Sequence, residues 1–277
     1  MTPVQKALWF AESHFADDIT LDEIANASGA SRFYLTRAFT ALSGQPLMRY
    51  VRGRRLTAAA RALASGAPDI LTVALDAGYG SHEAFTRAFA DQFGVTPERV
   101  RAQGDLANLD LVEPIRMDQT PLETLRPPRF VNGKPMLIAG PTERYTSESS
   151  AGIPAQWQRF LPHFNQVPGQ IGKVAYGVIY NTDDEGNMDY MTGVELPDFS
   201  RVPADWGRIR IPEHRYVVFE HPGHVSGIRR TWATIWNNWF PSSGHEPADG
   251  PTFERYDERF DSQTGNGGLE IWIPIRR

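Results

Sequence analysis

A short segment occurs twice in the chain, as SRFYLTRAF at residues 31–39 and as SHEAFTRAF at residues 81–89. Each copy follows a short apolar helical pattern that ends at a glycine, Gly29 in one case and Gly78 in the other. A repeat of this kind constrains the architecture strongly, because both copies must form the same local unit. It predicts two helix–turn–helix units with matching second helices, an arrangement typical of proteins that read DNA.

Residues 1–104 have the apolar spacing of helices throughout. Thr20 is followed by Glu23 at the position of a capping box, and Gly29 suits a helix that ends in a left-handed residue. Ser31 and Ser81 are expected to cap the two repeated helices at their N-termini. These patterns predict an all-α N-terminal domain that contains two helix–turn–helix units.

The repeated helices are the candidate DNA readers. In the first copy Leu35, Ala38 and Phe39 form the buried stripe, so the side chains around them are left for DNA. The candidate contacts are Arg32, Phe33, Tyr34, Thr36 and Arg37 in the first copy, and Ser81, His82, Glu83, Thr86 and Arg87 in the second. Arginine suits bidentate bonds to guanine, an aromatic ring suits a thymine methyl, and a glutamate can accept from cytosine.

An ordinary helical domain with a charged, solvated face is the alternative, and two copies at a fixed offset disfavour it. The residues just upstream of Thr-Arg-Ala-Phe differ between the copies, so the two helices are expected to read different bases. We therefore predict an asymmetric rather than a palindromic site on double-stranded DNA.

The net charge of −5 argues at first against a nucleic-acid partner. Residues 1–104, however, carry 11 basic against 10 acidic side chains, and the excess of acids lies in the remainder of the chain. A window without any acid contains Arg49, Arg52, Arg54, Arg55 and Arg61. Because local charge decides phosphate contact, this window is a candidate phosphate-binding surface.

Composition excludes several classes of site. Cysteine is absent, so disulfides, thiolate metal sites and cysteine nucleophiles are ruled out. No apolar run approaches the roughly 18 residues of a membrane span, and the N-terminus lacks the apolar core of a signal peptide. We expect a cytoplasmic protein with no membrane contact, no metal and no cofactor.

The remaining chain is expected to form a linker and a second domain. Residues 105–133 are proline-rich and aperiodic, which predicts a linker, and residues 134–277 read as short strands and two helices. The first set comprises a strand at 136–145, a helix at 153–164 and strands at 173–180 and 188–196. The second set comprises a strand at 209–221, a helix at 224–240 and strands at 252–259 and 268–275. The pattern is β-α-β-β twice, which predicts a pseudo-symmetric α+β domain.

This second domain holds a candidate ligand site. Trp232, Trp236 and Trp239 share one helix face by their spacing, as either a core stripe or the wall of an aromatic pocket. Strand alternation places Glu254 on the same face as Tyr256, as either an edge carboxylate in water or the charged floor of a pocket. A carboxylate among aromatic rings would attract a lipophilic cation.

Residues 5–103 resemble the DNA-binding domain of the AraC/XylS family of transcriptional regulators. The matching motifs are YVRGRRL at residues 50–56, and VALDAGY, FTRAF and FGVTP at residues 73–79, 85–89 and 93–97. Tyr79 stands where the family usually has phenylalanine. The resemblance implies that a long middle helix holds the two readers in adjacent major-groove segments, without any need for a dimer.

Residues 134–277 resemble a GyrI-like effector-binding domain. The matching motifs are AYG at 175–177, HPGHV at 221–225, FERY at 253–256 and LEIWIPI at 269–275. The resemblance implies a cleft between the two halves, with Glu254 at its floor and Tyr176, Tyr256, Trp232 and Trp236 as further ligand contacts. An AraC-type reader followed by this domain is the arrangement of the Rob-type regulators.

The sequence therefore predicts a DNA-binding transcriptional regulator that senses a small, lipophilic or cationic effector and has RNA polymerase as a further partner. Two alternatives stay open. Some GyrI-like proteins hydrolyse small molecules, and Glu254 with Tyr176 or Tyr256 could position a water molecule. The second domain could instead bind a protein such as polymerase or a topoisomerase. A DNA-binding half disfavours a pure enzyme.

Overall fold

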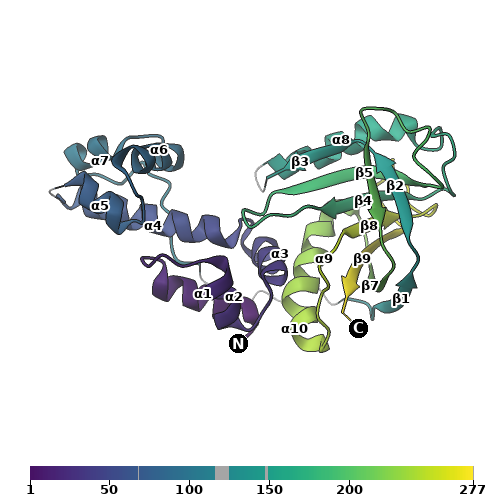
Figure 1. Ribbon diagram of the computed structural model, residues 1–277, viewed down its shortest axis with the longest axis horizontal. Helices are drawn as coiled ribbons and strands as arrows, with labels where there is room; N and C mark the ends of the chain where they lie inside the picture. The colour runs from purple at the N-terminus through teal and green to yellow at the C-terminus, as the bar shows by residue number, and fades with distance from the viewer. Residues whose placement is uncertain (68, 116–124, 147–148, 277) are drawn as a thin grey trace. The chain divides into compact units, whose positions relative to one another are not determined.

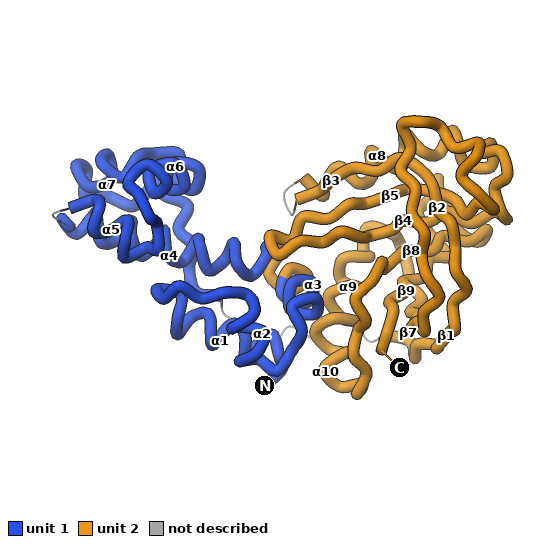
Figure 2. The backbone as a smooth tube through the Cα atoms, viewed as in Figure 1, with its two compact units in different colours: residues 1–39, 45–119 blue, residues 40–44, 120–277 orange. Residues whose placement is uncertain are grey.

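A computed structural model describes residues 1–67, 69–115, 125–146 and 149–276 of the chain. It divides into two compact units (Figure 2), of which the first contains residues 1–39 and 45–119 and the second contains residues 40–44 and 120–277. The first unit is helical and the second is built on a β-sheet (Figure 1). The predicted fold class, an all-α domain followed by an α+β domain, is confirmed.

The helices of the first unit follow the predicted order: α1 (Pro3–His14), α2 (Leu21–Ser28), α3 (Arg32–Ser43), α4 (Leu47–Ala64), α5 (Ile70–Asp76), α6 (His82–Phe93) and α7 (Pro97–Gln103). The capping box before α2 is formed, because Thr20 and Glu23 each bind the other's backbone N–H. Gly29 ends α2 with φ of 70°, a left-handed conformation in which glycine is favoured. These caps place α2 and α3 as one helix–turn–helix, and α5 and α6 as the other.

The segment after α7 packs on the long helix α4. The backbone N–H of Val112 donates to Thr57 Oγ1 at 2.9 Å, and the Val112 carbonyl accepts from Arg54 at 2.9 Å. Gly53 gives Val112 room, since a Cβ on that glycine would lie 2.7 Å from a Val112 methyl group. The first part of the expected linker is therefore an ordered strap on α4, while residues 116–124 lie outside the described residues.

The second unit contains both strands and short helices. In chain order the strands are β1 (Arg129–Gly133), β2 (Met136–Gly140), β3 (Thr142–Tyr145), β4 (Ala175–Tyr180), β5 (Met188–Leu196), β6 (Gly207–Ile211), β7 (His214–Glu220), β8 (Thr252–Tyr256) and β9 (Leu269–Ile275). The helices are α8 (Ile153–Phe160), α9 (Ile228–Thr234) and α10 (Phe240–Ser243), with a π-helical turn, η4 (Ile235–Trp239), between the last two.

The sheet has the strand order β1-β7-β9-β8-β4-β5-β2-β6, and β3 also pairs with β5. This order reads as two equivalent triplets, β7-β9-β8 and β2-β5-β4, that meet where β8 pairs with β4. Each triplet carries one helical segment in its connection, α9 or α8. The predicted duplication of a β-α-β-β unit is therefore present, with β1 and β6 added at the two edges.

Several predicted boundaries were wrong, and proline explains two of them. Pro141 separates β2 from β3, and Pro212 separates β6 from β7, although each pair was expected to be one strand. Proline has no N–H to donate to a neighbouring strand, so a strand tends to end there. The expected helix over residues 153–164 becomes α8 and a 3-10 turn, η2 (Leu161–His163). Residues 129–133 belong to the expected linker, but they form strand β1 because they pair with β7.

The two faces of the sheet have different neighbours. The face that carries Glu254 is covered by α8 and α9, since Phe160 packs with Val194 and Leu196 and Trp232 packs against Tyr190. The opposite face carries its own apolar cluster, in which Tyr176, Val178, Met191, Tyr216 and Phe253 are buried together. We refer to these as the helix-covered face and the back face.

Candidate functional site

The two candidate DNA-reading helices, α3 and α6, differ in how they present their predicted contacts. The exposed members of the set are Arg32, Ser81, His82, Glu83 and Arg87. Phe33, Arg37 and Thr86 are half-buried, and Tyr34 and Thr36 are buried. Ser81 also caps α6, because its hydroxyl accepts the Ala84 N–H at 3.1 Å. The predicted DNA contacts of all ten residues stay predictions.

Some of these side chains are already held in place. Arg32 pairs with Asp22 at 3.1 Å, and His82 pairs with Glu98 at 3.0 Å. The Arg37 guanidinium lies 4.4 Å from the centre of the Phe33 ring, a cation–π arrangement. Phe33 therefore supports the arginine on the next helical turn.

The arginine cluster on α4 is less available to phosphate than its sequence indicates. Arg54 is only 6% exposed and binds Glu12 at 2.9 Å, with Tyr50 donating to the same carboxylate. Arg55 donates to the backbone carbonyls of Phe15 and Asp17, and Arg61 pairs with Glu113 at 2.5 Å. These contacts lie inside the first unit, so three of the five arginines help to hold that unit together.

The candidate ligand site is centred on Glu254 in β8. This carboxyl group is 6% exposed and accepts hydrogen bonds from side chains of three other residues. Oε2 accepts from the Tyr190 hydroxyl at 2.8 Å and from the Tyr256 hydroxyl at 2.9 Å. Oε1 accepts from the Trp232 indole N–H at 3.1 Å. The result is an acidic group enclosed by aromatic side chains.

A fourth aromatic side chain completes the cluster from the other helix. The Trp157 indole N–H, on α8, donates to the Tyr190 hydroxyl at 3.0 Å. The Trp157 ring also lies 4.6 Å from the Tyr256 ring, centre to centre. One tryptophan from each half of the duplicated fold therefore reaches the Glu254 cluster.

Burial sets the electrostatics of this site. Desolvation raises the pKa of Glu254, while its three hydrogen-bond donors and the nearby His221 act in the opposite direction. The pKa values of Tyr190 and Tyr256 are raised well above their usual range, first by burial and then by the Glu254 carboxylate. Both tyrosines therefore stay protonated at neutral pH and donate to Glu254.

Gly177 makes the contact between Tyr190 and Glu254 geometrically feasible. It lies directly across from Glu254 in the pairing of β4 with β8. A Cβ at Gly177 would lie 2.9 Å from Glu254 Oε2 and would overlap the Tyr190 hydroxyl. The missing side chain thus leaves the space that the tyrosine hydroxyl occupies.

The structure brings together only part of the predicted ligand set. Tyr256 and Trp232 bind Glu254, and Trp236 stacks behind Trp232 at 6.5 Å with an interplanar angle of 9°. Tyr176 was assigned to the site wrongly: it pairs in register with Arg255, so it points to the back face and lies 5.9 Å from the Phe253 ring. Trp239 departs from the other two tryptophans to pack on Phe219, after the π-helical turn η4 has changed the helical register.

Sequence reasoning missed Tyr190 and Trp157. Tyr190 is paired with Ile179 in β4, two residues from Gly177, which places it on the helix-covered face beside Glu254. The sequence placed the AYG motif in the neighbouring strand, but only the register of β4 against β5 identifies Tyr190 as the residue that meets Glu254. Trp157 lies in the helix that was predicted over residues 153–164, and it was not assigned to the ligand site.

Two absences hold for the described part of the chain. Within residues 1–67, 69–115, 125–146 and 149–276, no cluster of three or more His, Asp or Glu side chains has the geometry to hold a metal ion. Over the same ranges, no helix combines the length and the apolarity that crossing a membrane requires.

Comparison with known proteins gives two family matches. Residues 126–276 match the family of the GyrI-like small molecule binding domain, and residues 24–103 match a helix-turn-helix domain family. The transcriptional regulator Rob of Salmonella typhimurium is 27% identical over 99% of this chain and 98% of its own length. The regulatory protein SoxS of Escherichia coli K12 is 36% identical over 35% of this chain and 92% of its own.

Similar proteins also include a further regulator and solved structures. The transcriptional regulator BrlR of Pseudomonas aeruginosa is 30% identical over 48% of this chain and 50% of its own. The structure of SAV2435 bound to tetraphenylphosphonium is 19% identical, with a TM-score of 0.46 over 55% of this chain and 94% of that one. At this similarity it carries no inference about the ligand of the present chain.

Proposed function

The chain belongs to the GyrI-like small-molecule-binding family and, with its AraC-type helix–turn–helix domain, is a DNA-binding transcriptional regulator of the Rob type; from this premise we propose what its second unit senses. The proposed effector is a lipophilic cation that binds at Glu254. The observation that carries this proposal is the buried carboxyl of Glu254, held by two tyrosines and a tryptophan.

The charge at this site supports a cationic ligand. None of the ion pairs among the described residues involves Glu254, and burial raises its pKa. A buried carboxylate without a cationic partner is costly, so a ligand that brings a positive charge would gain free energy from the pairing. Aromatic rings around the site would add cation–π attraction and would favour a ligand with apolar surface.

The test for the ligand is calorimetric titration of the full chain with tetraphenylphosphonium, a lipophilic cation. Glu254→Gln should weaken binding at least about tenfold, because it removes the charge and keeps the side-chain shape. Glu258→Gln is the matched control, since Glu258 is an exposed glutamate near the end of the same strand. Equal affinity in wild type and Glu254→Gln would remove Glu254 from the site.

For DNA, we propose that α3 and α6 read an asymmetric site, with Arg37 and Arg87 as central contacts. Arg37→Ala and Arg87→Ala should each weaken binding to a site selected from random-sequence DNA by about 1–3 kcal/mol. Arg210→Ala, an exposed arginine of the second unit, serves as the control. Unchanged affinity in both variants would refute the assignment of the two reading helices.

The same samples test the remaining alternatives. Mass analysis of the small molecule before and after incubation would reveal a hydrolase, whose turnover should stop in Glu254→Gln. Contact with RNA polymerase is proposed because the related proteins are transcriptional regulators. Capture of purified polymerase on promoter DNA by the full chain would test that contact.

A further inference from the structure

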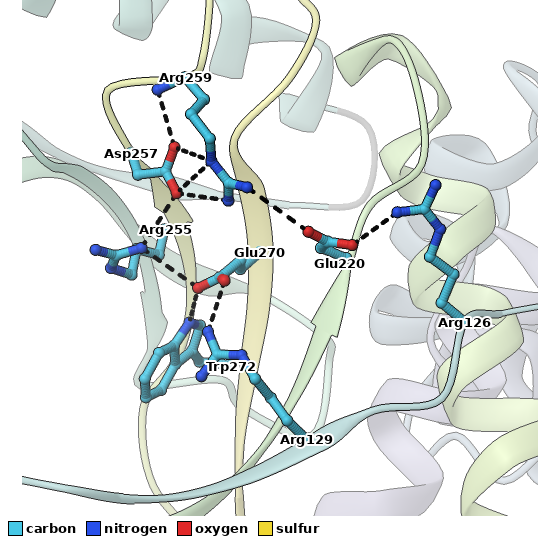
Figure 3. Close-up of polar contacts among 8 residues, drawn as sticks. All are labelled: Arg126, Arg129, Glu220, Arg255, Asp257, Arg259, Glu270 and Trp272. Carbon is cyan, nitrogen blue, oxygen red and sulfur yellow. Dashed lines mark hydrogen bonds and ion pairs between the residues drawn. The ribbon is translucent and has the colours of Figure 1, made fainter.

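The back face of the sheet carries a connected group of charged side chains (Figure 3). We call it the back-face network, and its members are Arg126, Arg129, Glu220, Arg255, Asp257, Arg259 and Glu270, with the Trp272 indole bound to it. Strand β8 joins it to the ligand site, because Glu254 and Arg255 are adjacent and project from opposite faces of that strand.

Glu270 is the centre of this network. Its side chain is 7% exposed and accepts from Arg129 on β1 at 2.6 Å and from Arg255 on β8 at 3.4 Å. The Trp272 indole N–H donates to the same carboxylate at 3.0 Å, and the Arg129 guanidinium lies 5.3 Å from the centre of the Trp272 ring. Because a buried carboxylate is costly unless it is paired, these contacts tie β1 and β8 to β9.

A second arm of the network runs from Arg255 to Arg126, which lies three residues before Arg129 in the chain. Arg255 also pairs with Asp257 at 3.5 Å, and Asp257 pairs with Arg259 at 2.8 Å. Glu220 then lies between Arg259 at 3.9 Å and Arg126 at 2.9 Å (Figure 3). Arg126 and Arg129 are therefore held by opposite ends of one network, which fixes the segment that leads into β1.

Strand β1 is the edge element in this region. Within the described ranges it is an edge strand that pairs with β7 along one side. Its side chains add the ion pair of Arg129 with Glu270 on the back face, and contacts of Phe130 with Trp239 and His245. An edge strand has backbone pairing on one side only, so the strength of its attachment depends in part on side-chain contacts such as this network.

The contacts of Arg255 are the ones that a change at Glu254 would alter first. They measure 3.4 and 3.5 Å, whereas Arg129 binds Glu270 at 2.6 Å. A ligand that replaces the hydrogen bonds of Glu254 must move the side chains around β8. A small shift of this strand would then weaken the hold of Arg255 on Glu270.

We propose that a ligand bound at Glu254 releases residues 125–133 from the sheet, and this inference rests on the proposed ligand site. The effect would pass from Glu254 through strand β8 to Arg255, from there to Glu270, and then to β1. These residues follow the part of the chain that connects the two units in sequence. Release of β1 would add its residues to the stretch of chain that joins the two units in sequence. The regulation of the site would thus be built into the back face.

Hydrogen exchange of the full chain, followed by mass spectrometry with and without saturating tetraphenylphosphonium, tests this inference. In wild type the amides of β1 should exchange about fivefold faster with the cation, as expected for loss of an interaction of ordinary strength. Arg129→Ala should exchange faster without the cation and respond little to it. Arg210→Ala, on the opposite edge strand β6, should behave as wild type.

A second variant shows whether faster exchange in Arg129→Ala comes from the network or only from the loss of the Arg129 side chain. Glu270→Gln keeps the shape of the side chain and weakens both arms, so it should reproduce the behaviour of Arg129→Ala. Bound cation with unchanged exchange in β1 would overturn the inference and leave the proposed ligand site standing. Failure of the cation to bind wild type would instead refute the proposed site, and the inference with it.

Discussion

The space at Gly177 gives the sharpest quantitative test of the Glu254 site. A Cβ at this position would overlap the Tyr190 hydroxyl and would lie 2.9 Å from Glu254 Oε2. Gly177→Ala must therefore displace the hydroxyl and break the 2.8 Å hydrogen bond that it donates to Glu254. The change adds one methyl group and leaves every other side chain of the cluster intact.

The expected cost combines two effects. Loss of a hydrogen bond to a charged group costs about 1.5–3 kcal/mol, and overpacking of a filled core costs about 1–3 kcal/mol. We expect Gly177→Ala to lower the free energy of unfolding of the second unit by about 3 kcal/mol. Urea denaturation followed by tryptophan fluorescence reports on this unit, because six of the seven tryptophans lie between residues 157 and 272.

A double-mutant cycle separates the overlap from a general effect of alanine. Tyr190→Phe removes the hydroxyl that the new methyl group would strike, so Gly177→Ala should cost at least about 1 kcal/mol less in that background. Gly250→Ala is the matched control, since a Cβ there would meet its nearest atom at an ordinary 3.6 Å. Additive effects of the two substitutions, or no cost for Gly177→Ala, would refute the packing argument.

Three further outcomes follow from the contacts. Because the pKa of Glu254 is higher in the folded protein than its unfolded value of about 4.5, the folded state favours the protonated carboxyl group. The stability that this protonated group contributes is fully present below pH 4.5 and is lost as the pH rises through the folded pKa. The free energy of unfolding of wild type should therefore fall relative to Glu254→Gln across that range in denaturation at several pH values, and parallel curves would contradict the shift. Arg54→Met should lower the free energy of unfolding of the first unit by about 3 kcal/mol, because the substitution leaves Glu12 without its cation. Hydrogen exchange in α4 should become faster, and unchanged exchange would count against the prediction. Gly29→Ala should cost about 1 kcal/mol in thermal unfolding, since φ is 70° there, and an equal melting temperature would count against it.

Local signals in the sequence predicted the parts of the fold that depend on neighbouring residues. The caps at Thr20 and Ser81 and the left-handed Gly29 are set within one helical turn, and all are formed. Alternation along a single strand also sufficed to place Glu254 and Tyr256 on one face. In each case the interacting groups are only a few residues apart.

Contacts between distant segments escaped the same reasoning. Tyr176 and Tyr190 are both tyrosines in apolar strands, and only the register of β4 against β8 and β5 decides which one meets Glu254. Arg54 resembles its neighbour Arg52 in sequence, but its partner Glu12 lies on α1. Arg129 fell in a proline-rich stretch near the middle of the chain, and its partner Glu270 lies near the C-terminus.

The pairing of Gly177 with Glu254 also sets how many charges the duplicated sheet can hold. Strands β4 and β8 are the equivalent strands of the two halves, and Gly177 and Glu254 form the middle pair of the five residue pairs that join them. A glutamate on both strands would bring two carboxylates to within about 5 Å in a buried space, where each would disfavour ionisation of the other. With glycine on one strand, the junction of the two halves carries a single acid at this pair, and the proposed cation would bind with a stoichiometry of one per chain despite the two halves of the fold.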